Sequence, residues 1–243
     1  MSHKDRFFDS YGKTHLTPRK GPVTRESLAV RAAAWRQLYS RFLPADRDAR
    51  ILDAGCGFGA VVWWLRTAGY QRAEGIDISA EQIQQAAELG IDGLVQADLE
   101  EFLQTHAATY DVILLRDVLE HFDKDAAVRV LDLIHGALKA RGTLIVQAPN
   151  GESPFGGRIR YGDFTHETAF TSASISQLLR VTGFEGVGTY PVRPVVRGIK
   201  SALRFVAWRV IELIYQALLN VEVGPGRFVV TQNVLAVGHK GRV

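Results

Sequence analysis

Hydrophobic and polar positions follow two alternating periods along residues 47–148. Short apolar runs, typical of buried strands, are separated by segments in which apolar residues recur every three or four positions, typical of helices. The predicted strands are 51–54, 73–78, 93–96, 110–115 and 143–148, and the predicted helices are 59–67, 80–89, 99–105 and 125–139. This alternation predicts an α/β fold: a parallel sheet with right-handed crossovers and helices on both faces.

The pattern changes on either side of this region. Before it, Thr24 is a suitable N-cap for an amphipathic helix that Pro44 stops. After Pro149 comes a long loop rich in glycine, aromatic and charged residues. The predicted elements that follow are a helix at 172–182, a strand at 183–191, a basic and apolar helix within 198–220 and a strand within 228–237.

These elements predict the organisation of the chain. We expect a lead and helical cover at 1–46, in which residues 1–22 are a flexible segment able to fold over a ligand. We expect one domain at 47–243, with a substrate loop at 149–172 and a helical insertion at 192–227 before the last strand.

Composition narrows the class of protein. The chain has 243 residues, of which 47% are hydrophobic and 23% charged, so we expect a folded domain. The formal charge of +3 is spread without a basic run, which argues against a nucleic-acid partner. Cys56 is the only cysteine, the first residues lack a signal-peptide core, and charges interrupt the apolar segment 205–221. We therefore expect a cytoplasmic protein without a membrane-spanning helix.

The stretch ILDAGCGFG, residues 51–59, lies between the first strand and the first helix. Glycines at 55, 57 and 59 would let a ligand approach the free N–H groups of the helix N-terminus. In an open parallel sheet, this loop marks the edge where ligands bind. The structural alternative is a tight turn that packs the strand against the helix.

Two further carboxylates stand at predicted strand ends. Asp77 can accept hydrogen bonds from both hydroxyls of a ribose, and Asp98 can hold an adenine amino group. Gly55, Gly57 and Ala60 also satisfy a dinucleotide-binding fingerprint, which makes NAD the rival ligand. Asp53 favours the other interpretation, because a carboxylate there would repel a pyrophosphate but suits an ammonium group.

Five segments together carry a resemblance to a family: ILDAGCGFG, GIDIS, QADLEEF, YDVILLRDVLEHF and RGTLIVQAPN, in order over residues 48–150. They resemble the class I S-adenosylmethionine-dependent methyltransferases. The resemblance implies a Rossmann-like, seven-stranded sheet with an antiparallel last strand, and S-adenosyl-L-methionine as cofactor. It also implies a cofactor site formed by Asp53, Gly55, Cys56, Gly57, Asp77, Ile78, Asp98, Leu99 and the backbone around Arg116.

A hydroxyl acceptor must lose its proton to a base when it is methylated. Glu120 and His121 follow the fourth strand, and Asp163, His166 and Glu167 lie in the 149–172 loop. We take His166 as the preferred base. The structural alternatives are that His121 caps a turn and that residues 165–167 cap the next helix. No set of ligands stands at a spacing typical of a metal site, so no metal is expected.

The segment RDVLEH replaces the Asn/Asp-Pro-Pro-aromatic signature of family members that methylate planar nitrogens, which favours oxygen or carbon. The C-terminal third resembles bacterial methyltransferases associated with cell-surface polysaccharide or glycolipid assembly. This resemblance implies a sugar hydroxyl or glycan acceptor. One alternative is an aromatic or quinone-like acceptor in an apolar pocket around Phe155, Tyr161, Phe164 and Trp208. Another is a catalytically silent, cofactor-binding partner protein.

The basic helix within 193–220 has two interpretations. Arg193, Arg197, Lys200 and Arg204 would share one face if the helix began early. We favour packing on the domain or on a second subunit of a homodimer. The alternative is docking on an anionic membrane or a lipid-linked substrate.

Overall fold

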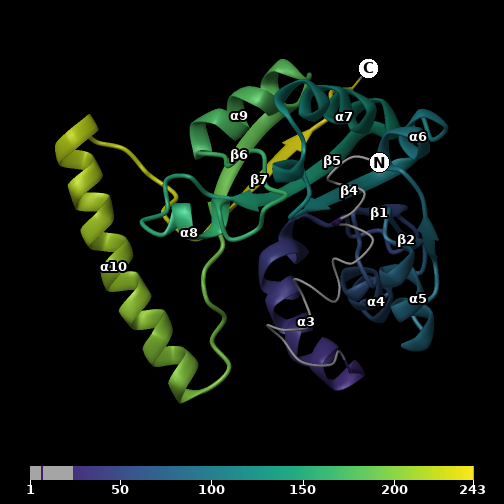
Figure 1. Ribbon diagram of the computed structural model, residues 1–243, viewed down its shortest axis with the longest axis horizontal. Helices are drawn as coiled ribbons and strands as arrows, with labels where there is room; N and C mark the ends of the chain where they lie inside the picture. Colours follow the sequence, from purple (N-terminus) through teal and green to yellow (C-terminus); the bar gives the residue numbers. More distant parts are fainter. Residues whose placement is uncertain (1–6, 8–23, 243) are drawn as a thin grey trace.

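A seven-stranded sheet runs through the computed structural model, which describes Phe7 and residues 24–242 (Figure 1). Among these residues the strand order is β3-β2-β1-β4-β5-β7-β6. The strands are β1 Ile51–Ala54, β2 Ala73–Asp77, β3 Leu94–Gln96, β4 Tyr110–Arg116, β5 Leu138–Pro149, β6 Glu185–Pro191 and β7 Asn233–His239. Strands β1 to β5 pair in parallel, and β7 runs antiparallel to both of its neighbours. The predicted fold class is therefore confirmed.

Helices cover both faces of the sheet. On one face pack α3 Arg25–Tyr39, α4 Ala60–Thr67 and α5 Ala80–Glu88, and on the other pack α6 Leu99–Gln104, α7 Lys124–Ala137 and α9 Ser172–Val181. The short α8 Gly156–Arg160 lies in the loop after β5, and α10 Ile199–Val223 lies between β6 and β7. Figure 1 shows α10 standing apart from the layered body.

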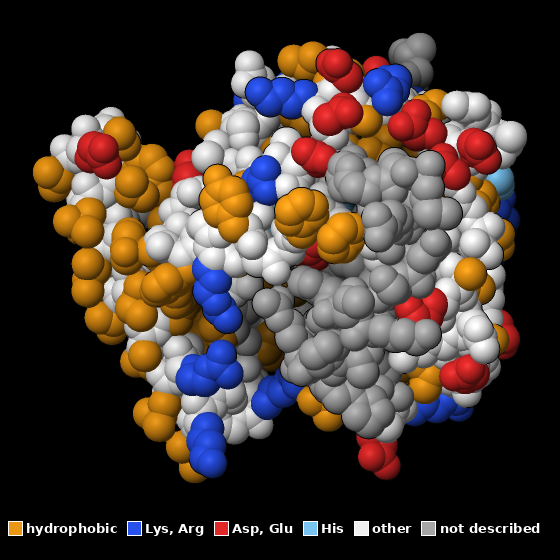
Figure 2. Space-filling model, viewed as in Figure 1, with side chains coloured by type: hydrophobic (Ala, Val, Ile, Leu, Met, Phe, Trp, Pro, Cys, Tyr) orange, Lys and Arg blue, Asp and Glu red, His pale blue; other side chains and the backbone are white. Residues whose placement is uncertain are grey.

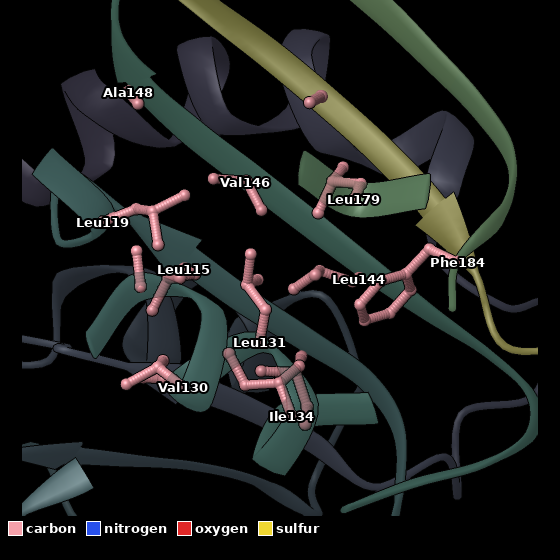
Figure 3. Packing of buried hydrophobic residues seen from close by; sticks show 14 of the residues in the cluster. Leu115, Leu119, Val130, Leu131, Ile134, Leu144, Val146, Ala148, Leu179 and Phe184 are labelled. Carbon is pink, nitrogen blue, oxygen red and sulfur yellow. The ribbon is translucent and has the colours of Figure 1, made fainter. Parts of the chain in front are cut away.

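The two layers explain the apolar runs of the central strands. Successive side chains of a strand point to opposite faces, so a strand covered on both sides must be apolar throughout. In β4, Ile113 and Leu115 join the core under α7, while Val112 and Leu114 join the core under α4. Figure 3 shows the first of these cores, where residues of α7 such as Leu131 pack on β4 and β5.

Most predicted elements are confirmed, and three differences have physical reasons. The strand predicted at 51–54 is β1, and Thr24 caps α3 with a capping box. The helix predicted to end at residue 139 ends at Ala137, because Leu138 pairs with Tyr110 and begins β5. The last strand, predicted within 228–237, starts at Asn233, because residues 228–232 lie outside its pairing with β5 and β6. Helix α8 was not predicted, because two glycines in its sequence disfavour a helix.

The lead predicted at residues 1–22 lies outside the described residues, apart from Phe7. The Phe7 ring stacks on Phe164, with ring centroids 5.4 Å apart. This contact joins one residue of the predicted lead to the loop after β5.

Truncation of the core under α7 tests this packing. Leu131 is fully buried between α7 and the sheet, so Leu131→Ala should lower the free energy of unfolding by about 2–5 kcal/mol. Val181→Ala is the matched control, because Val181 is 74% exposed and should change that free energy by less than about 0.5 kcal/mol. Urea denaturation followed by circular dichroism measures both values. Equal losses in the two variants would contradict the described core.

Candidate functional site

A cavity of about 680 Å³ opens where β1, β2, β4 and β5 end. The carboxyl ends of parallel strands form the usual binding edge of such a sheet. The segment after β1 and the segment after β4 both contribute to its wall. The lining residues used below are Gly55, Cys56, Gly57, Asp77, Ile78, Gln82, Asp98, Leu99, Arg116, Asp117, Glu120, His121, His166 and Asn233. The cavity thus brings together the predicted cofactor residues except Asp53, and the candidate bases except Asp163 and Glu167.

The glycine loop combines packing with an open ligand face. Gly55, Gly57 and Gly59 all have positive φ angles, from 56° to 76°, which side chains rarely adopt. A Cβ atom at Gly55 would lie 2.3 Å from Val118 Cγ2, and one at Gly59 would lie 2.4 Å from Leu94 Cδ1. Tight packing therefore explains these two glycines. At Gly57, a Cβ would have one neighbour within 4 Å, Gln82 Oε1 at 3.3 Å, which is the end of a flexible side chain, and Gly57 itself lines the cavity.

Asp77 holds this loop in place. Its Oδ2 accepts a hydrogen bond from the Gly57 N–H at 2.7 Å, and its Oδ1 accepts one from the Ser79 N–H at 2.9 Å. Burial raises the pKa of Asp77, and these two hydrogen bonds oppose the rise. A carboxylate offers about four lone-pair sites, so Asp77 keeps acceptor capacity on the cavity wall.

Asp98 has a structural role at its predicted position. Its Oδ1 accepts hydrogen bonds from the N–H groups of Glu100 and Glu101 and caps α6. Asp98 lines the cavity together with Ile78, whose side chain is half exposed, and Leu99. The cap fixes this part of the wall without occupying the cavity.

Asp53 is fully buried behind the lining residues. Neither carboxylate oxygen has a hydrogen-bond partner among the described residues. Burial raises the pKa of Asp53 to about 7, and the nearby Arg116 guanidinium opposes that rise. Arg116 lines the cavity and Asp53 does not, so any influence of Asp53 on a ligand would pass through neighbours such as this guanidinium.

One polar network was missed by the sequence analysis. Asp117 has a positive φ of 56°, which is uncommon for a residue other than glycine. Its carboxylate accepts hydrogen bonds from Gln147 Nε2 at 3.0 Å and Asn233 Nδ2 at 3.2 Å. Tyr39 in turn donates to Gln147 Oε1 at 3.0 Å. The sequence signal was Gln147 itself, a polar residue within the apolar run TLIVQAP.

Three of the five candidate bases, Glu120, His121 and His166, line the cavity. Glu120 and His121 lie in the short helix Leu119–His121 after β4, and His166 comes from the loop after β5. His166 Nε2 lies 3.9 Å from Glu120 Oε1, and the two imidazole rings meet edge to face with centroids 4.9 Å apart. Burial raises the pKa of Glu120 well above its usual value.

Hydrogen bonds fix the tautomers of both histidines. Thr165 Oγ1 donates to Asp163 Oδ1 at 2.7 Å, so it must accept from His121 Nδ1 at 2.9 Å. His166 Nδ1 lies 3.1 Å from the Ile159 carbonyl oxygen, which can only accept. Both rings therefore carry their proton on Nδ1 and keep a lone pair on Nε2. Burial and the neighbouring His166 lower the pKa of His121 to about 4, so His121 is neutral at pH 7.

The same three side chains could hold a metal ion. Glu120, His121 and His166 each offer one ligand atom, and these atoms all lie within 4.8 Å of one another. Two neutral imidazole nitrogens and a carboxylate oxygen suit a divalent transition metal. No metal was expected from the sequence, because His166 lies 45 positions after His121 and only the fold joins them.

The aromatic residues predicted to form an acceptor pocket do not contribute to this cavity. Phe155, Tyr161 and Phe164 are exposed, and neither they nor Trp208 line the cavity. The apolar residues that do line it include Trp35, Phe58, Val118, Phe122 and Ile159. The prediction was wrong because side chains in this part of the loop alternate between buried and exposed. The polar Asp163 and Thr165 are buried, whereas Phe164 between them points to solvent.

Comparisons with known proteins agree with this geometry. A family model described as a methyltransferase domain matches residues 28–188. A ubiquinone biosynthesis O-methyltransferase from Xylella fastidiosa is 33% identical over 107 residues, which are 42% of each protein. The chain thus aligns with less than half the length of this curated relative.

Solved structures share the fold. A SAM-dependent methyltransferase from Archaeoglobus fulgidus has a TM-score of 0.66 at 21% identity, over 89% of this chain and 96% of that one. A Haemonchus contortus N-methyltransferase in complex with S-adenosylhomocysteine has a TM-score of 0.58 at 15% identity, over 86% of this chain and 57% of that one.

The unusual state of Asp53 predicts a pH dependence of stability. A carboxyl whose pKa rises from 3.8 to about 7 on folding holds a proton that the unfolded chain releases. Its contribution is therefore complete below pH 3.8 and is lost as the pH rises through 7, at a cost of about 4 kcal/mol. Asp53→Asn should be more stable than the natural chain at pH 8 and closer to it at pH 5, in urea denaturation.

Glu120→Gln is the control for this experiment, because the pKa of Glu120 is raised in the same direction. Each substitution should remove a separate part of the pH dependence. An unchanged pH dependence in Asp53→Asn would mean that Arg116 keeps Asp53 ionised in the folded protein.

Proposed function

The chain belongs to the methyltransferase domain family, and on that premise we propose that it methylates a hydroxyl of an apolar, aromatic or quinone-like small molecule. One observation carries the proposal: a single cavity is lined both by the glycine loop with Asp77 and by Glu120, His121 and His166. A cofactor site and a proton-accepting site thus share one space. Most of the catalytic help in a displacement of this kind comes from alignment of the reacting groups.

The residues present fit S-adenosylmethionine, which supplies a methyl group from its sulfonium when it is bound. The wall offers acceptors: the carboxylate of Asp77 and Gln82 Oε1, a buried oxygen without a hydrogen-bond partner among the described residues. Asp77 would hold the ribose hydroxyls, and Ile78 and Leu99 would enclose the adenine. Asp77, Asp98 and Asp117 make this wall acidic, which suits a cationic ligand better than the pyrophosphate of NAD.

The acceptor is proposed from the apolar part of the wall. Val118, Phe122 and Ile159 line the cavity along with His121 and His166, and such a surface suits a flat apolar ring bearing a hydroxyl. The name of the Xylella relative, a ubiquinone biosynthesis O-methyltransferase, supports oxygen as the target and a quinone-like ring as the acceptor. Nothing in the family or the relatives supports the sugar acceptor expected from the sequence, or a link to polysaccharide assembly.

His166 is the proposed base. Its Nδ1 proton is held by the Ile159 carbonyl, so its Nε2 lone pair is free to take the proton of the acceptor hydroxyl. The imidazolium formed would lie 3.9 Å from Glu120 Oε1, and its charge would favour ionisation of this buried carboxyl, so that the two charges would stabilise each other. His121, neutral and held by Thr165, would position the acceptor beside it.

Calorimetric titration tests the cofactor site. Asp77→Asn leaves one side-chain oxygen to accept hydrogen bonds, where the carboxylate has two that hold Gly57 and Ser79. Binding of S-adenosylmethionine should therefore weaken by roughly 10- to 100-fold. Gly55→Ala should weaken it as well, because the Cβ would clash with Val118. The matched controls are Asp123→Asn, which keeps an N-cap on α7, and Gly157→Ala, whose Cβ would meet nothing within 4 Å. Binding of NAD in place of S-adenosylmethionine would contradict the assignment.

Turnover with hydroxylated aromatic and quinol acceptors tests the base. His166→Ala should lower kcat by roughly 100-fold or more, with little change in cofactor affinity. A chelator separates the two roles open to the three residues. Activity that survives chelation supports the base, whereas loss restored by Mn²⁺ or Zn²⁺ would replace it with a bound metal. Normal turnover in His166→Ala would contradict both, and no turnover with any acceptor would favour a silent binding protein.

A further inference from the structure

Helix α10 carries a continuous apolar stripe that faces away from the rest of the protein. Most of the exposed large hydrophobic residues of the helix are three or four positions apart and lie along one side, with Val223 off that side. The residues of this stripe are Ile199, Leu203, Val206, Val210, Leu213, Ile214, Leu218 and Val221. Ile199 and Val221, near its two ends, are 82% and 87% exposed. Over 25 residues the helix is about 37 Å long.

Figure 2 shows hydrophobic side chains gathered along the outer edge of α10. Packing of this side on the domain, as favoured from the sequence, is therefore absent from the described structure. Helix α10 begins at Ile199, so Arg193 and Arg197 precede it and do not share a helical face with Lys200 and Arg204.

Ion pairs on the opposite side fix the direction in which the stripe points. Glu212 is buried, and its carboxylate accepts two hydrogen bonds from Arg193 Nε and Nη2, at 3.0 and 2.9 Å. Arg209 also pairs with this carboxylate. Since Arg193 lies in the segment that follows β6, these pairs tie the helix to its own connection and leave the stripe outward.

The charges beside the stripe are mostly positive. Arg197, Lys200 and Arg204 are exposed and make no ion pair with a described residue. The exposed acidic residue of the helix is Glu222, near its C-terminal end, because Glu212 is buried and paired. Figure 2 shows basic side chains next to the lower half of α10 and an acidic one at its upper tip.

We propose that α10 lies on the surface of an anionic lipid bilayer, with its apolar stripe inserted between the headgroups and its basic residues on lipid phosphates. An amphipathic helix with an apolar side and basic flanks binds such an interface. No helix within the described part of the chain is long and apolar enough to cross a membrane, so the helix would lie in the plane of the surface. A second copy of this chain fits the stripe less well. Two copies that each carry three exposed cations and one exposed anion beside the stripe would repel each other.

Vesicle flotation tests the proposal with the full chain. Vesicles of phosphatidylcholine with 30% phosphatidylglycerol are compared with vesicles of phosphatidylcholine alone. The stripe variant is Val210→Glu with Leu213→Glu, and its control is Val30→Glu with Val181→Glu, which adds the same charge at exposed apolar positions elsewhere. The basic variant replaces Arg197, Lys200 and Arg204 by Gln, and its control replaces the exposed Arg72, Lys124 and Arg180 by Gln.

The expected result is binding to the anionic vesicles that is lost in the stripe variant and falls by roughly 100-fold in the basic variant. Both controls should bind like the natural chain. This readout needs no turnover, so it stands apart from the proposed methyl transfer. Absence of binding to anionic vesicles would overturn the proposal. A dimer in analytical ultracentrifugation that dissociates in the stripe variant, without vesicle binding, would overturn it in favour of a second copy.

Discussion

The two hydrogen bonds that the Asp77 carboxylate accepts from the N–H groups of Gly57 and Ser79 organise the candidate site. They join the loop after β1 to the turn between β2 and α5, which lies 20 residues further along the chain. With Gly57 held in this way, the loop keeps its left-handed glycines and leaves the cavity open beside them. The proposed cofactor site depends on this geometry, because a loop that Asp77 did not hold would not keep its backbone along the cavity wall.

Buried polar groups set the chemistry on the other side of the cavity. Thr165 and the Ile159 carbonyl hold the Nδ1 protons of His121 and His166, which leaves both Nε2 lone pairs in a region shared with Glu120. Burial disfavours charge on Glu120 and on His121 when no ligand is bound, which is why the pKa of the carboxyl is raised and that of the imidazole is lowered. A proton taken by His166 from an acceptor hydroxyl, or a divalent ion held by the three residues, would place a positive charge beside Glu120 and so favour its ionised form.

The outward face of α10 belongs to a different physical problem. The layered body buries its apolar residues between sheet and helices, whereas α10 buries only its Glu212 side and exposes the other. Because an exposed apolar stripe of this size is costly in water, it points to a partner surface. A bilayer would also be the phase in which an apolar, quinone-like acceptor dissolves, so the two proposals are compatible while each rests on its own residues.

The sequence by itself determined the order of the elements and the glycine loop after the first strand, because local periodicity and glycine conformation are legible along the chain. The antiparallel β7 followed only from the family resemblance, since periodicity does not give the direction of a strand. The sequence also named Glu120, His121 and His166. Only the tertiary structure decided that these three meet, that Tyr39, Asp117, Gln147 and Asn233 form one network, and that Phe155, Tyr161 and Phe164 lie outside the cavity. Such contacts join residues far apart in the chain, and local patterns carry no information about which distant side chains fold onto the same wall.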